Sequence, residues 1–499
     1  MCFANPGTSE MHFVAALDRK PEMRCILGAF EGVVTGAADG YGRMTRRPAA
    51  TLLHTGPGLA NGLANLHNAR RASTPIINVV GDHASHHLKF DAPLTSDIES
   101  LARPMSNWVH RVASSEEVGS AVGEAYLAAR TIPGVATMIL PADAAWGEVP
   151  DQVARPIDVP APLLPDARDI RDVASAIRQH RGRFGLLLGG EAALEEGTEW
   201  AGRIAEVFEG RVFAEVLPTR VARGRGRVSP QSIPYPIEMS LQTLKDVELL
   251  VLVGAVEPVA FFGYPGKPSR LLPEGSSAIA LAGRSEDQTG ALRALAEELG
   301  AAGKRTRLDL PALGSVDLSG PLTGDAIGQL LARNLPDGAI VCDEGGMSAW
   351  SFRALARQAA QHDALSVTGG SIGIGIPMSV GAAVACPYRK VVNLEADGSG
   401  LYTVQGLWTE AREDLDILTI IFSNRAYGIL QMELKNLGVT EVGRNARRMM
   451  SLDDPPLDWV QIAQGMGVEA RRVDTCEAFA KILRVALKRR GPFLIECVI

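Results

Sequence analysis

The sequence predicts a protein of the α/β class, with three doubly wound domains built on parallel sheets. Apolar runs of strand length alternate with segments of helical period from one end of the chain to the other, which is the pattern of strand–helix units around buried parallel sheets. The chain has 499 residues, which is enough for about two to four domains. Two proline-rich stretches divide it into three series of such units.

The first series of units lies near the amino end. Short apolar runs predict strands at residues 50–53, 76–80 and 135–140. Segments of helical period at 59–73 and 116–131 supply the connections between them. Together these units form one domain.

A linker is predicted at residues 150–165, where five prolines stand in a stretch with little periodicity. The first domain should therefore end near residue 160. A second and smaller α/β domain follows. Its helices are predicted near 193–208 and 290–299, and its strands at 184–188, 211–216, 249–253 and 278–282.

A second linker is predicted at residues 300–321, which hold a cluster of basic residues together with Pro311 and Pro321. A third series of units begins at Leu322, with strands predicted at 339–341, 391–394, 417–422 and 493–498. The three predicted domains are residues 1–155, 165–302 and 320–499.

The composition describes a globular chain whose partners are small molecules. Hydrophobic residues make up 46%, charged residues 21%, and there are 52 glycines, which excludes disorder, collagen-like repeats and a small disulfide scaffold. Fifty Lys and Arg against 57 Asp and Glu give a formal charge of −7. Because no basic run is present that could neutralise a phosphate backbone, nucleic acid is not expected as the main partner.

The cysteines and the apolar segments indicate a cytoplasmic protein. Six cysteines are scattered without a CxxC pair, which fits reduced thiols better than disulfides or a zinc site. No apolar segment reaches the roughly 18 to 20 residues needed to cross a bilayer, and no export signal precedes Asn5. We therefore expect neither a membrane span nor visible export.

Two polar segments follow neighbouring predicted strands of the third series. Asp397, Gly398 and Ser399 come just after the strand at 391–394, and Asn424 follows the next strand. One strand–helix–strand unit brings such strand ends together, so that a carboxylate and an amide oxygen would lie side by side. Both are ligands that Mg²⁺ accepts, commonly with phosphate oxygens, although Asp-Gly-Ser taken alone also fits an ordinary turn. Gly398 would let the backbone approach phosphates, and Ser399 could open a helix whose N–H groups point at them.

The segment from Asp397-Gly-Ser to Asn424 closely resembles the cofactor-binding motif of thiamine-diphosphate enzymes, in the superfamily of acetolactate synthase (large subunit), pyruvate oxidase and benzoylformate decarboxylase. The resemblance covers the whole chain, because several blocks follow in the family's order. They are residues 5–10 (Asn-Pro-Gly-Thr-Ser-Glu), 30–32, 38–41, 56–58, 61–62 and 369–377. The resemblance implies a pyrimidine-binding first domain, a central domain and a diphosphate-binding third domain.

Glu31 stands in an apolar segment, which would keep the proton of a carboxylic acid available. Without the other blocks it would read as a glutamate that interacts with a helix dipole. The resemblance implies that Glu31 hydrogen bonds the aminopyrimidine ring of the cofactor and helps to remove the thiazolium proton. Such chemistry needs the protein mainly for positioning and for one matched acid–base group.

Further cofactor contacts are implied by the resemblance alone. The carbonyl of Gly370 would accept a hydrogen bond from the pyrimidine amine, and Ile372 would hold the cofactor bent. The carbonyl of Ala426 would complete the Mg²⁺ shell with Asp397 and Asn424. The segment around Gly346 and Met347 follows a predicted strand and suits either an anion nest or a plain helix cap; by resemblance, these two residues would contact phosphate oxygens.

His54 ends the strand at 50–53, at the carboxyl end where a proton shuttle would face a ligand, although a histidine there can also be purely structural. Benzoylformate decarboxylases carry a histidine at this position, whereas acetolactate synthases generally do not. Thr8 falls where the decarboxylase has a serine that contacts the substrate carboxylate. A second decarboxylase histidine would fall near residues 261–263, which are Phe-Phe-Gly here.

We therefore expect a decarboxylating carboligase of acetolactate synthase type that uses thiamine diphosphate and Mg²⁺ on a 2-oxo acid. The alternatives are a non-oxidative 2-oxo acid decarboxylase and a non-catalytic regulatory homologue. By resemblance, Glu31 of one subunit meets Asp397, Asn424 and Ile372 of another, so a homodimer or homotetramer is expected.

Some relatives hold FAD in the middle domain, but no residue pattern here supports it. The family has a helix before its first strand, so we expect either a start upstream of Met1 or the loss of that helix. The sequence does not identify the donor acid or the acceptor.

Overall fold

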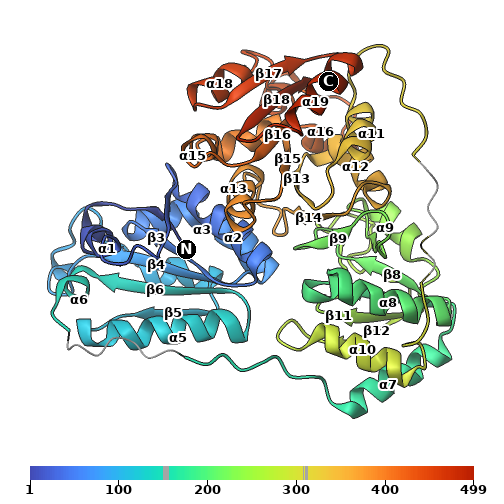
Figure 1. Cartoon of the computed structure of the whole chain (residues 1–499), viewed down its shortest axis with the longest axis horizontal. Helices are drawn as coiled ribbons and strands as arrows, with labels where there is room; N and C mark the ends of the chain where they lie inside the picture. Colours follow the sequence, from blue (N-terminus) through green and yellow to red (C-terminus); the bar gives the residue numbers. More distant parts are fainter. Residues whose placement is uncertain (150–156, 307, 309–312) are drawn as a thin grey trace.

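The computed structural model describes residues 1–149, 157–306, 308 and 313–499 (Figure 1). Its strands form three sheets of six, five and seven strands, and helices cover each of them. The predicted α/β class and the three sheet-containing domains are therefore confirmed. The two predicted linkers, 150–165 and 300–321, fall partly outside the described residues.

The first sheet is parallel, with the order β2-β1-β3-β4-β6-β5. The order reverses between β1 and β3, so the carboxyl ends of these two strands form the crevice where open α/β sheets bind ligands. Its strands are β1 (Cys2–Asn5), β2 (Cys25–Leu27), β3 (Ala49–Leu53), β4 (Ile76–Asp82), β5 (Trp108–Arg111) and β6 (Val135–Pro141), and its longest helices are α2 (Glu31–Thr45), α3 (Thr55–Ala72) and α5 (Val118–Thr131).

The central sheet is also parallel, with the order β10-β8-β7-β11-β12. The four strands predicted here are present: two have the predicted bounds, and the other two differ at one end by one or two residues. The strands are β7 (Phe184–Leu188), β8 (Arg211–Ala214), β10 (Gln231–Ser232), β11 (Leu249–Val253) and β12 (Ser277–Ala282), and the helices are α7 (Ala167–Gln179), α8 (Glu195–Phe208), α9 (Ile237–Leu244) and α10 (Gln288–Glu298).

The third sheet has the order β17-β18-β16-β15-β13-β14-β9. Its order reverses between β13 and β15, which places a second ligand crevice at the carboxyl ends of these strands. The strands are β13 (Ala339–Glu344), β14 (His362–Ser366), β15 (Val391–Ala396), β16 (Ile417–Ser423), β17 (Glu469–Val473) and β18 (Phe493–Val498), with helices that include α11 (Gly324–Asn334), α13 (Gly375–Ala385), α15 (Gly406–Arg412), α16 (Gly428–Asn436) and α19 (Cys476–Ala486).

The edge strand β9 (Val221–Arg223) departs from the simple three-domain prediction. It comes from the central part of the sequence, yet it pairs antiparallel with β14 of the third sheet. Arg220 fixes it there, because its guanidinium donates to Asp363 at 2.9 Å. A strand of three residues is too short to show periodicity, so the sequence did not predict it.

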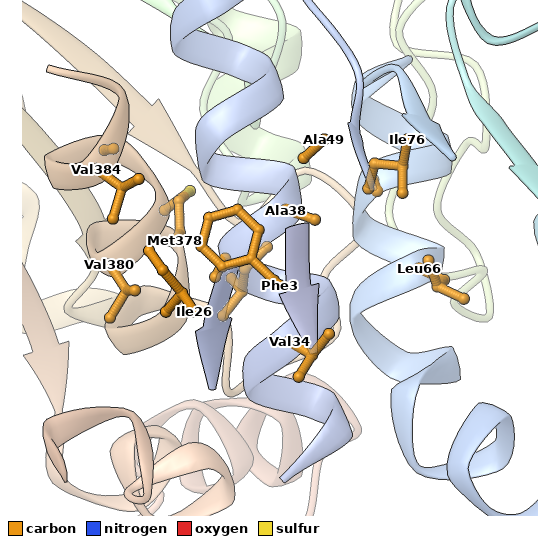
Figure 2. Close-up of a cluster of buried hydrophobic side chains, with 14 of the residues drawn as sticks. Phe3, Ile26, Val34, Ala38, Ala49, Leu66, Ile76, Met378, Val380 and Val384 are labelled. Atoms are coloured by element: carbon orange, nitrogen blue, oxygen red, sulfur yellow. The ribbon is translucent and has the colours of Figure 1, made fainter. Parts of the chain in front are cut away.

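The first and third domains meet where α2 packs against α13. A Cβ on Gly40 would overlap the Met378 carbonyl, and a Cβ on Gly381 would overlap the Ala37 carbonyl, so both positions need glycine for the helix backbones to approach. Figure 2 shows buried side chains from both helices and from the first two strands around this contact, including Phe3, Ile26, Val34, Ala38, Met378, Val380 and Val384.

No helix in the described part of the chain combines the length and the apolarity needed to span a bilayer.

Candidate active site

His54 and Glu10 meet at the crevice of the first sheet. His54 follows β3, and Glu10 closes the 3-10 turn (Thr8–Glu10) after β1. Nδ1 of His54 lies 2.8 Å from Oε2 of Glu10, which is almost fully buried. Because an ionised carboxylate only accepts hydrogen bonds, it assigns the ring proton to Nδ1 and leaves Nε2 for proton exchange.

Two further donors and two glycines hold this carboxylate and the imidazole ring in place. Glu10 also accepts from the Ser9 hydroxyl at 2.5 Å and from the Gly7 N–H at 2.7 Å. A Cβ on Gly7 would overlap the His54 ring, and a Cβ on Gly81 would overlap the Glu10 carboxylate. Thr8 is exposed in the same turn, so the residue expected to meet the substrate carboxylate lies within two positions of Glu10.

Glu31 is the first residue of α2 and is half-buried. Its Oε2 accepts a hydrogen bond from Asn61 Nδ2 at 3.0 Å, and Asn61 is on the exposed face of α3. Asn61 belongs to a block that the sequence singled out, but the bond to Glu31 was not predicted. This hydrogen bond orients the carboxyl group at the start of the helix.

Asp397 and the loop of Asn424 to Ala426 come together at the carboxyl ends of the neighbouring strands β15 and β16, as the spacing predicted. Asp397 directly follows β15, and its Oδ2 accepts from the Arg425 N–H at 2.6 Å. Asn424 Oδ1 accepts from the Ala426 N–H at 3.0 Å. Arg425 adopts a left-handed backbone with φ of 55°, which turns the loop toward Asp397.

The chemistry of these groups fits a hard divalent cation. Asp397 is buried, and this burial raises the pKa of its carboxyl to about 6, so a cation beside it would relieve a carboxylate that the protein solvates poorly. No cluster of three His, Cys, Asp or Glu side chains among the described residues could hold a metal ion. A cation here would therefore depend on the mixed carboxylate, amide and carbonyl oxygens of Asp397, Asn424 and Ala426, a set that suits Mg²⁺.

The backbone at Gly346 leaves room for an anion, whereas the space beside Gly398 is filled by a side chain. Gly346 has a φ of 55° and its missing Cβ faces open space, so the turn after β13 presents bare backbone beside Met347. Gly398 packs against the Tyr427 ring, which leaves no room for a side chain. Ser399 lies within the short helix α14 (Asp397–Gly400), and its hydroxyl donates to buried Glu395 at 2.6 Å rather than facing outward.

Gly370 and Ile372 lie on the segment before α13. Gly370 has a φ of 71°, and a Cβ there would contact the Phe261 ring, which comes from the central domain. Ile372 is 37% exposed, as a side chain that supports a bound group would be. Two phenylalanines, Phe261 and Phe262, therefore occupy the region where the decarboxylase has its second histidine. The Phe261 ring packs against Gly370, in the segment that is expected to contact the cofactor.

Glu344 fixes the backbone of the segment before α13, a role that the sequence did not predict. Its carboxylate accepts hydrogen bonds from three consecutive N–H groups, those of Gly373 (2.8 Å), Ile374 (2.9 Å) and Gly375 (2.6 Å). Burial raises the pKa of Glu344 to about 7, against the effect of these three bonds. The strand position before two glycines was the only available signal, because the partners lie about thirty residues away.

Two asparagines of α3 join the two halves of the site within one chain. Asn65 Nδ2 donates to the carbonyls of Gly32 (2.8 Å) and Gly373 (3.2 Å), and Asn68 Nδ2 donates to that of Ser371 (2.7 Å). The start of the helix that carries Glu31 therefore lies next to the segment that carries Gly370 and Ile372. Assembly of one site from two chains stays a prediction.

A cavity of about 920 Å³ opens beside the loop that carries Asn424 and Ala426. Its lining includes Gln431 and Lys435 of α16 together with Arg447. The positive charges in this lining suit an anionic ligand next to the expected metal.

Comparison with known proteins supports this assignment of the two halves. Residues 1–103 match the family described as thiamine pyrophosphate enzyme, N-terminal TPP binding domain. Residues 343–497 match the family described as thiamine pyrophosphate enzyme, C-terminal TPP binding domain. The two matches contain all the candidate residues named for cofactor, metal and proton transfer.

Relatives and solved structures resemble the chain over its whole length. A Mycobacterium tuberculosis protein, provisionally named acetolactate synthase large subunit IlvX, is 46% identical over 100% of this chain and 96% of its own. The benzoylformate decarboxylase of Pseudomonas aeruginosa is 28% identical over 99% and 95%. The structure of a Rhodococcus jostii thiamine-diphosphate-dependent 4-hydroxybenzoylformate decarboxylase superimposes with a TM-score of 0.87 at 24% identity, covering 100% of this chain and 95% of the other, which shows a shared fold.

Proposed function

The chain belongs to the family of thiamine-diphosphate-dependent enzymes, and on that premise we propose that it decarboxylates a 2-oxo acid with the help of thiamine diphosphate and Mg²⁺. Thiamine diphosphate, when bound, supplies the nucleophilic carbon and the electron sink that loss of carbon dioxide requires. The chain's own residues bind, orient and exchange protons around it.

Asp397, Asn424 and the carbonyl of Ala426 would hold Mg²⁺, and the backbone at Gly346 and Met347 would receive the diphosphate. The support is the buried, poorly solvated carboxylate of Asp397 and the open backbone at Gly346. Gly370 and Ile372 would position the ring system. Glu31, oriented by Asn61, would exchange a proton with the pyrimidine ring.

The pairing of Glu10 with His54 is the observation that carries the proposed outcome of the reaction. Because Nδ1 of His54 is hydrogen bonded to the Glu10 carboxylate, Nε2 is the ring nitrogen that can pass a proton to the reacting carbon after carbon dioxide leaves. For this step the ring must carry a proton on Nε2 as well as on Nδ1, and the Glu10 carboxylate lies where it would face the charge of that ring. The site geometry therefore supports release of an aldehyde best.

Carboligation of the acetolactate synthase type is the second candidate, in which a second carbonyl compound takes the place of the proton. The relative that is 46% identical along the whole chain favours it. The paired rings of Phe261 and Phe262 would provide an apolar surface beside Gly370 for the substrate of either reaction.

The proposed cofactor set contains no flavin. In the central sheet the strand order reverses between β7 and β11, which is where a nucleotide would bind. Buried Gln288 fills that crevice and accepts from the Ala192 N–H at 3.1 Å, and Arg284 pairs with Glu215 beside it. A colourless preparation is expected, and visible flavin absorbance would contradict this part.

We further propose a cytoplasmic homodimer or homotetramer whose substrate is a small 2-oxo acid. The cysteines are all free thiols, which fits a reducing compartment. A catalytic assembly is favoured over a regulatory homologue because Glu31, Asp397 and Asn424 are all retained, and a scaffold has no need of them.

Product analysis tests the proposal. The holoenzyme would be incubated with benzoylformate, with pyruvate alone, and with pyruvate plus 2-oxobutyrate. A free aldehyde would support proton transfer from His54, and acetolactate-type products would support carboligation. Absence of carbon dioxide release from a panel of 2-oxo acids by protein that binds thiamine diphosphate would contradict both.

A further inference from the structure

Two cysteines meet at the amino end of the first sheet, at the opposite end from the candidate active site. Cys2 is the first residue of β1 and Cys25 the first residue of β2, and the two are paired in register across the parallel strands. Neighbouring strands lie about 4.8 Å apart, which is within the range of about 4.4–6.8 Å that Cα atoms span in disulfides. Both side chains pack in the same apolar cluster.

The two thiols differ in exposure and in acidity. Cys2 is fully buried, whereas Cys25 is partly exposed at the edge strand. The side chain of Cys2 is the main cause that lowers the pKa of the Cys25 thiol to about 7, and that of Cys25 is the main cause that raises the pKa of Cys2. Each thiol also has a backbone acceptor, the carbonyl of Phe3 for Cys2 (3.7 Å) and that of Met23 for Cys25 (3.3 Å). The accessible sulfur is therefore the better nucleophile, and the buried sulfur stands next to it as a second thiol.

Cys386 offers a comparison within the same chain. It is also partly exposed, but burial raises the pKa of its thiol. A reagent that attacks thiolates should therefore distinguish Cys25 from Cys386 although solvent reaches both.

We propose that Cys2 and Cys25 form a thiol–disulfide couple that exchanges with small disulfides such as oxidised glutathione. The Cys25 thiolate attacks one sulfur of the glutathione disulfide, whose S–S bond breaks and releases one glutathione thiolate. Cys2 then loses its proton to that thiolate and attacks the Cys25 sulfur, releasing the second glutathione. The protein loses two electrons and two protons, and one glutathione disulfide becomes two glutathiones.

The bond would close the segment that carries the turn of the active site. Thr8, Ser9 and Glu10 lie between the two cysteines in the sequence. A cross-link at the base of β1 and β2 would restrict this segment in the unfolded chain and would so stabilise the first domain. The oxidised protein should unfold at a higher temperature than the reduced protein.

Mass spectrometry of the full-length protein tests the couple. The protein would be equilibrated with reduced or oxidised glutathione, alkylated and digested with trypsin without reduction. Cys2 and Cys25 then fall in different peptides, residues 1–19 and 25–43. We expect these peptides to be disulfide-linked after oxidation and separate after reduction, and an oxidised sample in which Cys25 carries glutathione while Cys2 remains free would overturn the proposal.

Two variants control the assignment. Cys25→Ser should lose the linked peptides and the rise in unfolding temperature by several degrees, whereas Cys386→Ser should keep both. In the reduced wild type, brief alkylation at pH 7 should label Cys25 about tenfold faster than Cys386. Equal labelling rates, or an oxidised wild type that unfolds no later than the reduced one, would count against a bond that fits the native geometry.

Discussion

Glu10 Oε2 and His54 Nδ1 are 2.8 Å apart, although 44 residues separate them in the chain. The strand order of the first sheet explains the contact, because β1 and β3 are neighbours at the point where the order reverses. Among the described residues, this pair bears most directly on the choice between the two proposed outcomes, because it is a contact seen in the structure. It therefore makes the most informative target for mutation.

Glu10→Gln should lower kcat by about tenfold to a thousandfold, with little change in KM, because His54 loses the carboxylate that accepts from Nδ1 and orients its ring. The pH–rate profile should change as well, since the group that donates the proton is altered. Steady-state kinetics over pH would measure both. Glu124→Gln, at an exposed position on α5, is the matched control and should keep its activity; equal losses in the two variants would show that the effect is not specific to the contact with His54.

Gly81→Ala should reproduce the loss of Glu10→Gln without changing any residue that contacts the reacting groups. The added methyl group would overlap the Glu10 carboxylate and push it away from His54. Because the obstructing atoms are at the end of a flexible side chain, folding should survive, with an expected cost of about 1–3 kcal/mol. Activity and thermal unfolding would be compared; full activity in a folded variant would argue against the role of the contact.

Glu31→Gln should keep cofactor binding and lose most activity, by about a hundredfold to ten-thousandfold, because an amide still accepts a hydrogen bond but cannot exchange the proton. Calorimetric titration with thiamine diphosphate and Mg²⁺ gives the binding constant, and carbon dioxide release gives the rate. Glu22→Gln, at an exposed position in the same domain, is the matched control. Undiminished turnover in Glu31→Gln would remove this residue from the proton chemistry.

The sequence was sufficient for the parts of the site that are local. Asp397 and Asn424 follow the paired strands β15 and β16, so one strand–helix–strand unit brings their segments together, and the N–H of Arg425, next to Asn424, donates to Asp397. Glu31 could likewise be assigned to a helix start from its own neighbours. In each case the signal lies within a short stretch of chain.

The parts that were missed depend on contacts between distant segments. The role of Glu10 requires the order of β1 and β3, and the role of Glu344 requires the path of the backbone at Gly373 to Gly375. Composition and periodicity carry no information about strand order. The pairing of β9 with β14 in the third sheet could not be predicted either, because the three residues of β9 are too few to show a strand pattern.

Asp397→Asn should weaken the binding of thiamine diphosphate in the presence of Mg²⁺ by at least about tenfold, because the site loses its only anionic ligand among the three proposed. Calorimetry with and without Mg²⁺ measures the effect, and dialysis of the wild type against a chelator should produce the same weakening. Asp414→Asn changes an exposed aspartate before the next strand and should bind normally. Equal binding by the Asp397 variant and the wild type would disprove the proposed metal site.

Glu410→Gln should make the protein more stable at neutral and alkaline pH. Glu410 is fully buried on α15, and neither carboxylate oxygen has a hydrogen-bond partner among the residues that the structure describes. Burial raises the pKa of this carboxyl well above its ordinary value of 4.5. As the pH rises above that value, the unfolded chain releases the proton while the folded chain retains it, so the wild type loses about 1.4 kcal/mol of stability per pH unit until the folded group ionises.

The amide of the Glu410 variant does not titrate, so its stability should exceed that of the wild type by a margin that grows with pH and is smallest near pH 4.5. Unfolding by urea at a series of pH values measures this margin. Glu477→Gln, at an exposed position on α19, should show no such trend. A margin that stayed constant with pH would contradict the prediction, because Glu410 would then ionise in the folded protein at its ordinary pKa. Such ionisation would require a cation or a water-filled channel beside a side chain that is fully buried in the structure.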